Sequence, residues 1–152
     1  ILQAYQNSLM KVQLSGPTLF APIISSAAQV ANHSFATSHT YTVLLILTDG
    51  VINDMRETTD AIVAATDSPL SIIIIGVGNA NFSAMDALDA DENPLVSSSG
   101  VRMKRDIVQF VPFNKYQANN GFGLEAEVLA EVPRQVHEFC STHGFVPQLS
   151  HF

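Results

Sequence analysis

Two apolar runs constrain the fold of this chain more than any other feature. Residues 43–47 are all apolar, and residues 70–77 contain four consecutive isoleucines. Neither run alternates between apolar and polar side chains, which is typical of strands covered on both faces in a parallel sheet. A stretch with helical periodicity separates them, as a crossover between parallel strands requires. The sequence therefore predicts a buried parallel sheet.

The remaining pattern alternates helices with strands and contains no internal repeat. We expect a helix ending near Met10, helices over residues 19–36, 54–66, 82–88 and 124–142, and strands over residues 42–48, 70–77 and 107–111. Asp54 and Glu57 resemble a capping box that would start the helix over residues 54–66. Pro133 either kinks the last helix or marks its true start. The chain is thus predicted to be an α/β domain, an open parallel sheet with helices on both faces.

Composition narrows the classes of partner and compartment. Seven basic and fourteen acidic residues give a net charge of -7, which disfavours a nucleic-acid surface because phosphate binding needs clustered Lys and Arg. The one basic cluster, at Arg102, Lys104 and Arg105, is too short for such a surface. The single cysteine, Cys140, excludes an internal disulfide and suits a reducing compartment. No apolar run approaches the ~20 residues that span a bilayer.

Motifs for catalysis are weak in this sequence. Residues 76–81 read Gly-Val-Gly-Asn-Ala-Asn between a strand and a helix, as in a dinucleotide fingerprint, but Asn81 takes the third glycine position. A glycine-bearing turn is the simpler interpretation, and a nucleotide-binding enzyme remains the alternative. A calcium loop starting at Asp89 fails, because Pro94 replaces its required glycine.

Thr18 and Asp49 are the candidate metal ligands. Asp49 follows the strand over residues 42–48, at the carboxyl end where open α/β sheets place their ligands. It could instead simply stabilise the turn with Gly50. Thr18 lies in the loop before the first long helix, and its hydroxyl could reach the same edge of the sheet. Such oxygen ligands suit Mg²⁺ or Mn²⁺, although two are too few to hold the ion with useful affinity by themselves.

Five segments, in the same order and spread over nearly the whole chain, resemble the copine family. They are GPTLFAPII at residues 16–24, LLILTDGVI at residues 44–52, SIIIIGVG at residues 71–78, RDIVQFVPF at residues 105–113 and LAEVP at residues 129–133. A single GVG would be weak, but the ordered set is highly specific.

The resemblance implies the C-terminal part of a von Willebrand factor A-type domain, a Rossmann-like fold. Residues 1–152 would then be a partial domain lacking its first strand and its D-x-S/T-x-S loop, and the visible strands would be the last three. Thr18 matches the threonine of the second metal-binding loop and Asp49 the aspartate of the third. The strand over residues 43–47 would become an exposed apolar edge.

By the same resemblance, the function is a protein-interaction module without enzymatic activity. The parent protein would carry calcium-sensing, phospholipid-binding domains ahead of this one and move from the cytoplasm to the plasma membrane when calcium rises. This domain would then recruit target proteins, through the Mg²⁺ or Mn²⁺ site or as a scaffold without metal. A fragment of a copine-like RING ubiquitin ligase is a further alternative, although its zinc module would lie outside this chain.

Overall fold

Three parallel strands form the centre of the molecule. The computed structural model describes residues 2–13, 15–89, 93–117 and 121–145. The strands are β1 (Thr42–Thr48), β2 (Leu70–Gly76) and β3 (Val108–Pro112), in the spatial order β1-β2-β3. All pairing is parallel, with Thr42 opposite Leu70 and Ile72 opposite Val108. All three carboxyl ends therefore lie at one edge of the sheet, as the apolar runs predicted.

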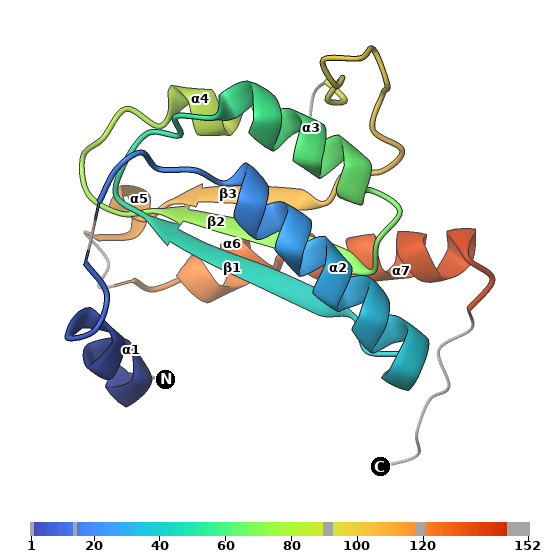
Figure 1. Cartoon of the computed structure of the whole chain (residues 1–152), viewed down its shortest axis with the longest axis horizontal. Helices are drawn as coiled ribbons and strands as arrows, with labels where there is room; N and C mark the ends of the chain where they lie inside the picture. Colours follow the sequence, from blue (N-terminus) through green and yellow to red (C-terminus); the bar gives the residue numbers. More distant parts are fainter. Residues whose placement is uncertain (1, 14, 90–92, 118–120, 146–152) are drawn as a thin grey trace.

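Helices cover both faces of the sheet, which confirms the predicted fold class (Figure 1). Helices α2 and α3 lie on one face and α6 and α7 on the other. The helices are α1 (Leu2–Leu9), α2 (Ala21–Ser38), α3 (Met55–Ala65), α4 (Ser83–Asp86), α5 (Asn114–Gln117), α6 (Leu124–Leu129) and α7 (Val132–Thr142). Within the described part of the chain, no helix combines the length and apolarity needed to cross a bilayer.

The two apolar strands are buried to different extents. Every residue of β2 is buried, and Ile72 and Ile74 join the core formed with α2 and α3. In β1, Ile46 faces the same core, whereas Val43, Leu45 and Leu47 point to the other face and are 44%, 53% and 65% exposed. The prediction that residues 43–47 are covered on both faces is therefore wrong for this chain, because α6 packs against β3 and α7 against β2 while alternate residues of β1 stay exposed.

The outer edge of β3 is closed to further strands. The amide of Ile72 in β2 donates to the Ile107 carbonyl, so the alternate residues of β3 direct their backbone groups outward. The Val108 amide donates to Asp106 Oδ1 at 3.1 Å, the Phe110 amide donates to Asp89 Oδ2 at 3.0 Å, and Pro112 has no amide proton. Carboxylates and a proline thus occupy the positions through which another strand would pair.

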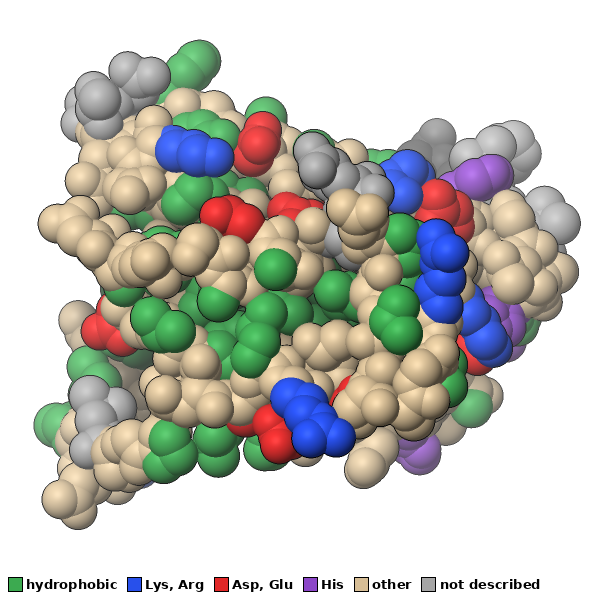
Figure 2. Space-filling view, turned by 90° about the horizontal axis from the view of Figure 1, so that it is seen from above, with side chains coloured by type: hydrophobic (Ala, Val, Ile, Leu, Met, Phe, Trp, Pro, Cys, Tyr) green, Lys and Arg blue, Asp and Glu red, His purple; other side chains and the backbone are tan. Residues whose placement is uncertain are grey.

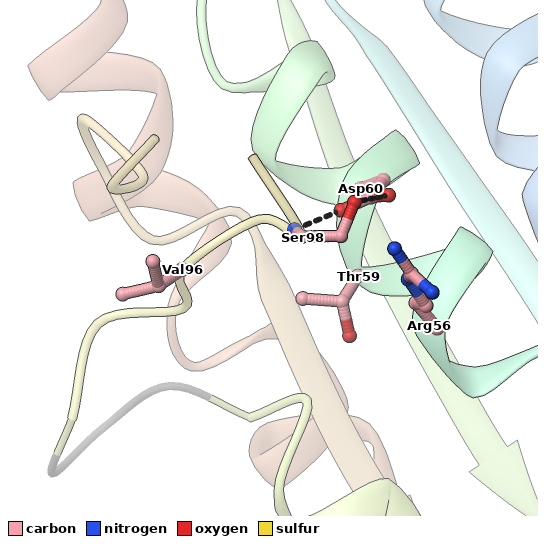
Figure 3. A pocket seen from close by; sticks show the side chains of 5 residues that line it. All are labelled: Arg56, Thr59, Asp60, Val96 and Ser98. Carbon is pink, nitrogen blue, oxygen red and sulfur yellow. Dashed lines mark hydrogen bonds between the residues drawn. The ribbon is translucent and has the colours of Figure 1, made fainter. Parts of the chain in front are cut away.

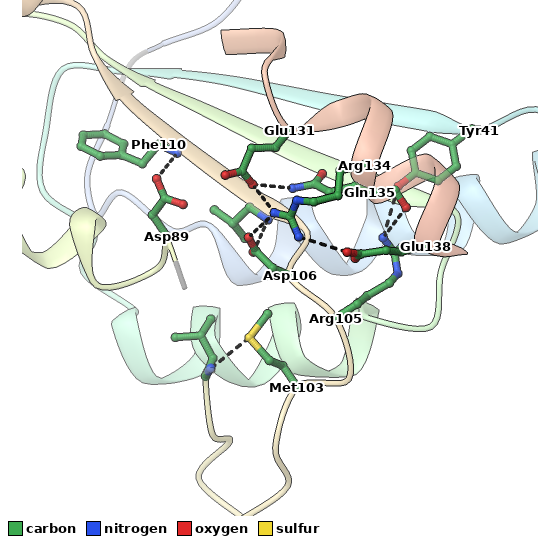
Figure 4. Close-up of polar contacts among 12 residues, drawn as sticks. Tyr41, Asp89, Met103, Arg105, Asp106, Phe110, Glu131, Arg134, Gln135 and Glu138 are labelled. Atoms are coloured by element: carbon green, nitrogen blue, oxygen red, sulfur yellow. Dashed lines mark hydrogen bonds and ion pairs between the residues drawn. The ribbon is translucent and has the colours of Figure 1, made fainter. Parts of the chain in front are cut away.

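Arg105 connects several elements at the opposite, amino-terminal edge of the sheet. The sequence suggested a short basic surface cluster, but this guanidinium is partly buried and stacks on Phe139 of α7 at 5.4 Å from the ring centroid. It donates hydrogen bonds to the hydroxyl of Tyr41 and to the carbonyl of Gln135 (Figure 4). It also donates to the carbonyls of Thr66, Ser68 and Leu70. One side chain thereby joins the start of β2 to α7.

The helix boundaries correct three details of the prediction. The single helix expected over residues 124–142 is two helices, α6 and α7, and Pro133 lies in the first turn of α7, so it marks a true start. Helix α5 was not predicted. The capping box at Asp54 is also wrong, because this residue occupies the N-cap position of α3 without a side-chain bond to that helix's amides.

Shortening a side chain should cost more stability in the buried strand β2 than on the exposed face of β1. We expect Ile74→Ala to lower the free energy of unfolding by about 2–5 kcal/mol, because it leaves a cavity in a fully buried strand. Leu45→Ala, on the exposed face of β1, should cost less than about 1 kcal/mol. Urea unfolding of both variants measures the difference. Equal losses would contradict the assignment of the exposed face.

Candidate functional site

The loops that carry Thr18 and Asp49 meet at the carboxyl edge of the sheet. Asp49 directly follows β1 and is exposed, whereas Thr18 precedes α2 and is half-buried. A Cβ atom built on Gly50 would lie 3.9 Å from the Thr18 hydroxyl oxygen, so this hydroxyl lies close to the Asp49–Gly50 turn. The structure thus brings the Thr18 hydroxyl close to the turn that carries Asp49, and the metal-binding role of the two residues stays a prediction.

Asn53 and Asp54 join these two loops. The Thr18 amide donates to Asn53 Oδ1 at 2.8 Å, and the Asn53 amide donates to the Thr18 carbonyl at 3.0 Å. The Asp54 carboxylate accepts the amides of Phe20 at 3.0 Å and Ala21 at 2.9 Å. These amides belong to the start of α2, so Asp54 satisfies the N-terminal donors of a helix that lies more than 30 residues earlier in the sequence.

The surroundings of Asp54 favour its charged form. Burial opposes ionisation, because the residue is only 8% exposed. Hydrogen bonds from the amides of Phe20 and Ala21 and from the Thr58 hydroxyl outweigh that effect and lower the pKa of Asp54 below its usual value of 3.8. The carboxylate is therefore ionised at neutral pH, and both of its oxygens are already engaged in hydrogen bonds.

A second group of oxygen atoms lies beside β3 (Figure 4). One carboxylate oxygen from each of Asp89, Asp106 and Glu131 lies within 4.8 Å of the others, a spacing that a metal ion could bridge. Arg134 already supplies a positive charge there, since its guanidinium donates to Asp106 at 3.3 Å and to Glu131 at 3.0 Å. Asp89 and Asp106 also accept the β3 amides. This cluster therefore has a structural role without any ion.

Sequence reasoning missed this cluster because its members come from three separate segments. The calcium loop that would start at Asp89 fails on its sequence, and Asp91 of that loop lies outside the described residues. Arg134 lies three residues after Glu131 and four residues before Glu138, at the start of α7 and within it. This spacing is the sequence signal for the two ion pairs. Nothing in the local sequence indicates that Asp106 and Asp89 join them.

A shallow pocket of about 340 Å³ lies between α3 and the loop of residues 93–103 (Figure 3). Arg56, Thr59 and Asp60 of α3 line one side, and Val96 and Ser98 line the other. The Asp60 carboxylate accepts the Ser98 hydroxyl and the Ser98 amide, each at 2.6 Å, and these bonds lower the pKa of Asp60. The acidic group of this pocket thus serves to hold the loop against α3.

Packing and backbone geometry explain why the nucleotide-like motif contains glycines. A Cβ atom on Gly76 would lie 3.0 Å from the Phe82 ring, so the close packing of this ring requires glycine. Gly78 has φ +86°, a backbone conformation that favours glycine. The Asn81 side chain accepts the Ser83 amide at 3.0 Å and forms the turn into α4. The motif is therefore explained by packing and turn geometry without a phosphate.

Charged groups are dispersed over the face above α3 and α4. In Figure 2 the basic side chains of the described residues stand in separate groups, each beside acidic side chains. Lys104 pairs with Asp67, and Arg134 pairs with Asp106, Glu131 and Glu138. The positive charges of these residues are thus locally compensated.

Comparison with known proteins identifies the family. A family model for copines matches residues 1–148. Copine-A of Dictyostelium discoideum is 49% identical over 148 residues, which cover 97% of this chain. The chain belongs to the copine family. The match covers 24% of Copine-A, so this chain spans about a quarter of the length of that relative. The resemblance seen in the ordered sequence segments is confirmed.

The pH dependence of stability should report the charge on Asp54. A carboxylate whose folded pKa is lowered contributes stability above its unfolded pKa of ~3.9, and that stability is lost as the pH falls through the folded pKa. We expect Asp54→Asn to lower the free energy of unfolding by about 1–2 kcal/mol at pH 7. Urea unfolding at pH 7 and pH 3 should show this difference shrinking at pH 3, because below ~3.9 the unfolded state protonates Asp54 while the folded state resists protonation. A difference of the same size at both pH values would refute the assignment.

Proposed function

We propose that this copine chain is a protein-interaction module that recruits target proteins, with Thr18 and Asp49 contributing to a site for Mg²⁺ or Mn²⁺. The observation that supports the proposal is the meeting of the Thr18 hydroxyl with the Asp49–Gly50 turn at the carboxyl edge of the sheet. In open α/β folds this edge is where ligands bind. Membership of the copine family agrees with a binding role for the chain.

The donor atoms fit such an ion. A threonine hydroxyl and an aspartate carboxylate are oxygen donors, which Mg²⁺ and Mn²⁺ prefer over nitrogen or sulfur. Asp49 is exposed and Thr18 is half-buried, so the site is accessible from solvent. Mg²⁺ usually keeps several waters and takes one or two carboxylates from the protein, so two protein ligands give only weak binding.

The charge of these ligands suits recognition of an acidic partner. Thr18 is neutral, and Asp49 brings a single negative charge. A divalent ion held by these two groups would keep a net positive charge and attract a carboxylate of the target protein. The other carboxylate of this loop, Asp54, is turned toward α2 and bonded there, so it does not add a second negative charge at the ion.

Membrane recruitment is a proposal about the whole protein. We infer that the parent moves from the cytoplasm to the plasma membrane when calcium rises, through phospholipid-binding parts outside residues 1–152. The chain spans only about a quarter of its relative Copine-A, which leaves room for such parts in a protein of that length. In this proposal, other parts of the protein bind the membrane, and the present domain binds target proteins without catalysing a reaction.

Metal titration tests the proposed site. We expect calorimetry to show weak Mn²⁺ binding by the wild-type chain, and Asp49→Ala to weaken it further, about tenfold or more, because it removes the only charged ligand. Mn²⁺ at about 100 times its Kd should raise the Tm by on the order of 5–10 °C. The control is Asp86→Ala, which removes an exposed carboxylate from α4 and should leave binding unchanged. Equal binding by wild type and Asp49→Ala would exclude the site.

A further inference from the structure

Asn53 fixes the backbone of the residue that carries the candidate hydroxyl ligand. Its side-chain oxygen accepts the Thr18 amide at 2.8 Å, while its own amide donates to the Thr18 carbonyl at 3.0 Å. Both backbone polar groups of Thr18 are therefore bound by one residue that lies 35 positions later in the sequence. An asparagine can supply this pair of bonds, whereas alanine keeps only the backbone half.

Asp54 fixes the next turn of the same segment. Oδ1 accepts the Phe20 amide and the Thr58 hydroxyl, and Oδ2 accepts the Ala21 amide. Phe20 occupies the N-cap position of α2 and has no side chain able to cap it, so the acceptor comes from a distant segment. The carboxylate is buried and ionised, which strengthens these bonds relative to those of a neutral acceptor.

These bonds set the position of one candidate ligand relative to the other. Asp49 and Asn53 belong to the same short loop between β1 and α3, while Thr18 belongs to the loop before α2. Without the four bonds from the two loop residues, the Thr18 hydroxyl would be free to move away from the Asp49–Gly50 turn. With them, the distance between the two loops is fixed before any ion arrives.

We propose that Asn53 and Asp54 are positioning residues of the Thr18–Asp49 cation site. The inference rests on the cation site proposed above. Neither residue needs to touch the ion, since Asp54 has both oxygens engaged and Asn53 Oδ1 accepts the Thr18 amide. Their contribution is to hold two loops in the binding geometry, which lowers the entropy cost of assembling the site. Loss of such supporting bonds typically weakens metal binding about 10–100-fold.

The Asn53→Ala substitution tests this role without changing the charge. Mn²⁺ binding is measured by calorimetry on the wild-type chain and on Asn53→Ala, and amide hydrogen exchange is measured for the segment around Thr18. Asn53→Asp keeps the acceptor oxygen but adds a negative charge, so it serves as the rescue for hydrogen exchange at Thr18 and not for Mn²⁺ affinity. The matched control is Asn79→Ala, the same substitution at an exposed residue of the β2–α4 loop at the same edge of the sheet.

The expected result is a loss of about 10–100-fold in Mn²⁺ affinity for Asn53→Ala, with faster exchange at Thr18 and an unchanged circular-dichroism spectrum. Asn53→Asp should restore the slow exchange at Thr18, and Asn79→Ala should match wild type in both measurements. If the wild-type chain takes up no Mn²⁺, the cation site fails and this inference falls with it. If wild type binds and Asn53→Ala binds equally well, only the positioning role is overturned.

Because a folding defect could imitate this result, Thr58→Val provides a second variant. It removes one hydrogen bond to Asp54 Oδ1 but leaves both amide bonds from α2 in place. We expect it to lower the Tm while changing Mn²⁺ affinity by less than about threefold, well below the loss for Asn53→Ala. If Thr58→Val and Asn53→Ala lose affinity in proportion to their loss of Tm, general stability explains the effect and the positioning role is rejected.

Discussion

The parallel pairing of β2 with both of its neighbours is the constraint on which the rest of this structure depends. Parallel strands need a crossover of a dozen or more residues, and here α3 provides the crossover between β1 and β2. Because the strands run in one direction, every loop after a strand lies at the same edge. That geometry places the Asp49 loop beside the loop that enters α2. It explains why polar residues far apart in sequence contact one another at the carboxyl edge of the sheet.

The two sheet edges have opposite properties. Asp106, Asp89 and Pro112 close the outer edge of β3, whereas β1 carries exposed Val43, Leu45 and Leu47 on its uncovered face. The outer edge of β3 is blocked against further strands, whereas an apolar edge strand such as β1 is prone to pair with another strand. Within the described residues, the side chains and the proline at β3 disfavour growth of the sheet on that side. This agrees with the expectation that further strands of the domain pair beside β1, which stays a prediction.

The sequence predicted elements whose signals are local and missed features that depend on distant partners. All three strands were predicted, β1 and β2 from their apolar runs, and Pro133 correctly offered the start of α7 as one interpretation. Asp54 has the local pattern of a cap for α3, yet its carboxylate accepts amides of α2, and a contact across more than 30 residues leaves no local sequence signal. Burial of β1 on both faces was also wrong, since an apolar strand does not reveal whether a helix reaches its second face. For the candidate site, residue type and position were enough to propose Thr18 and Asp49, which stay a prediction, whereas no local signal pointed to Asn53.

Charge balance distinguishes the two groups of oxygen atoms in this chain. Beside β3, the Arg134 guanidinium lies between Asp106 and Glu131, and the β3 amides bind Asp89 and Asp106, so a cation entering there would compete with an existing one. At the Thr18–Asp49 site the situation is reversed, because the hydrogen bonds from Asn53 and Asp54 hold the loops without using Asp49. The carboxylate that remains exposed is the one a divalent ion can reach at the lowest desolvation cost. For this reason the Thr18–Asp49 edge, and not the larger acidic cluster, is the better candidate for a cation site.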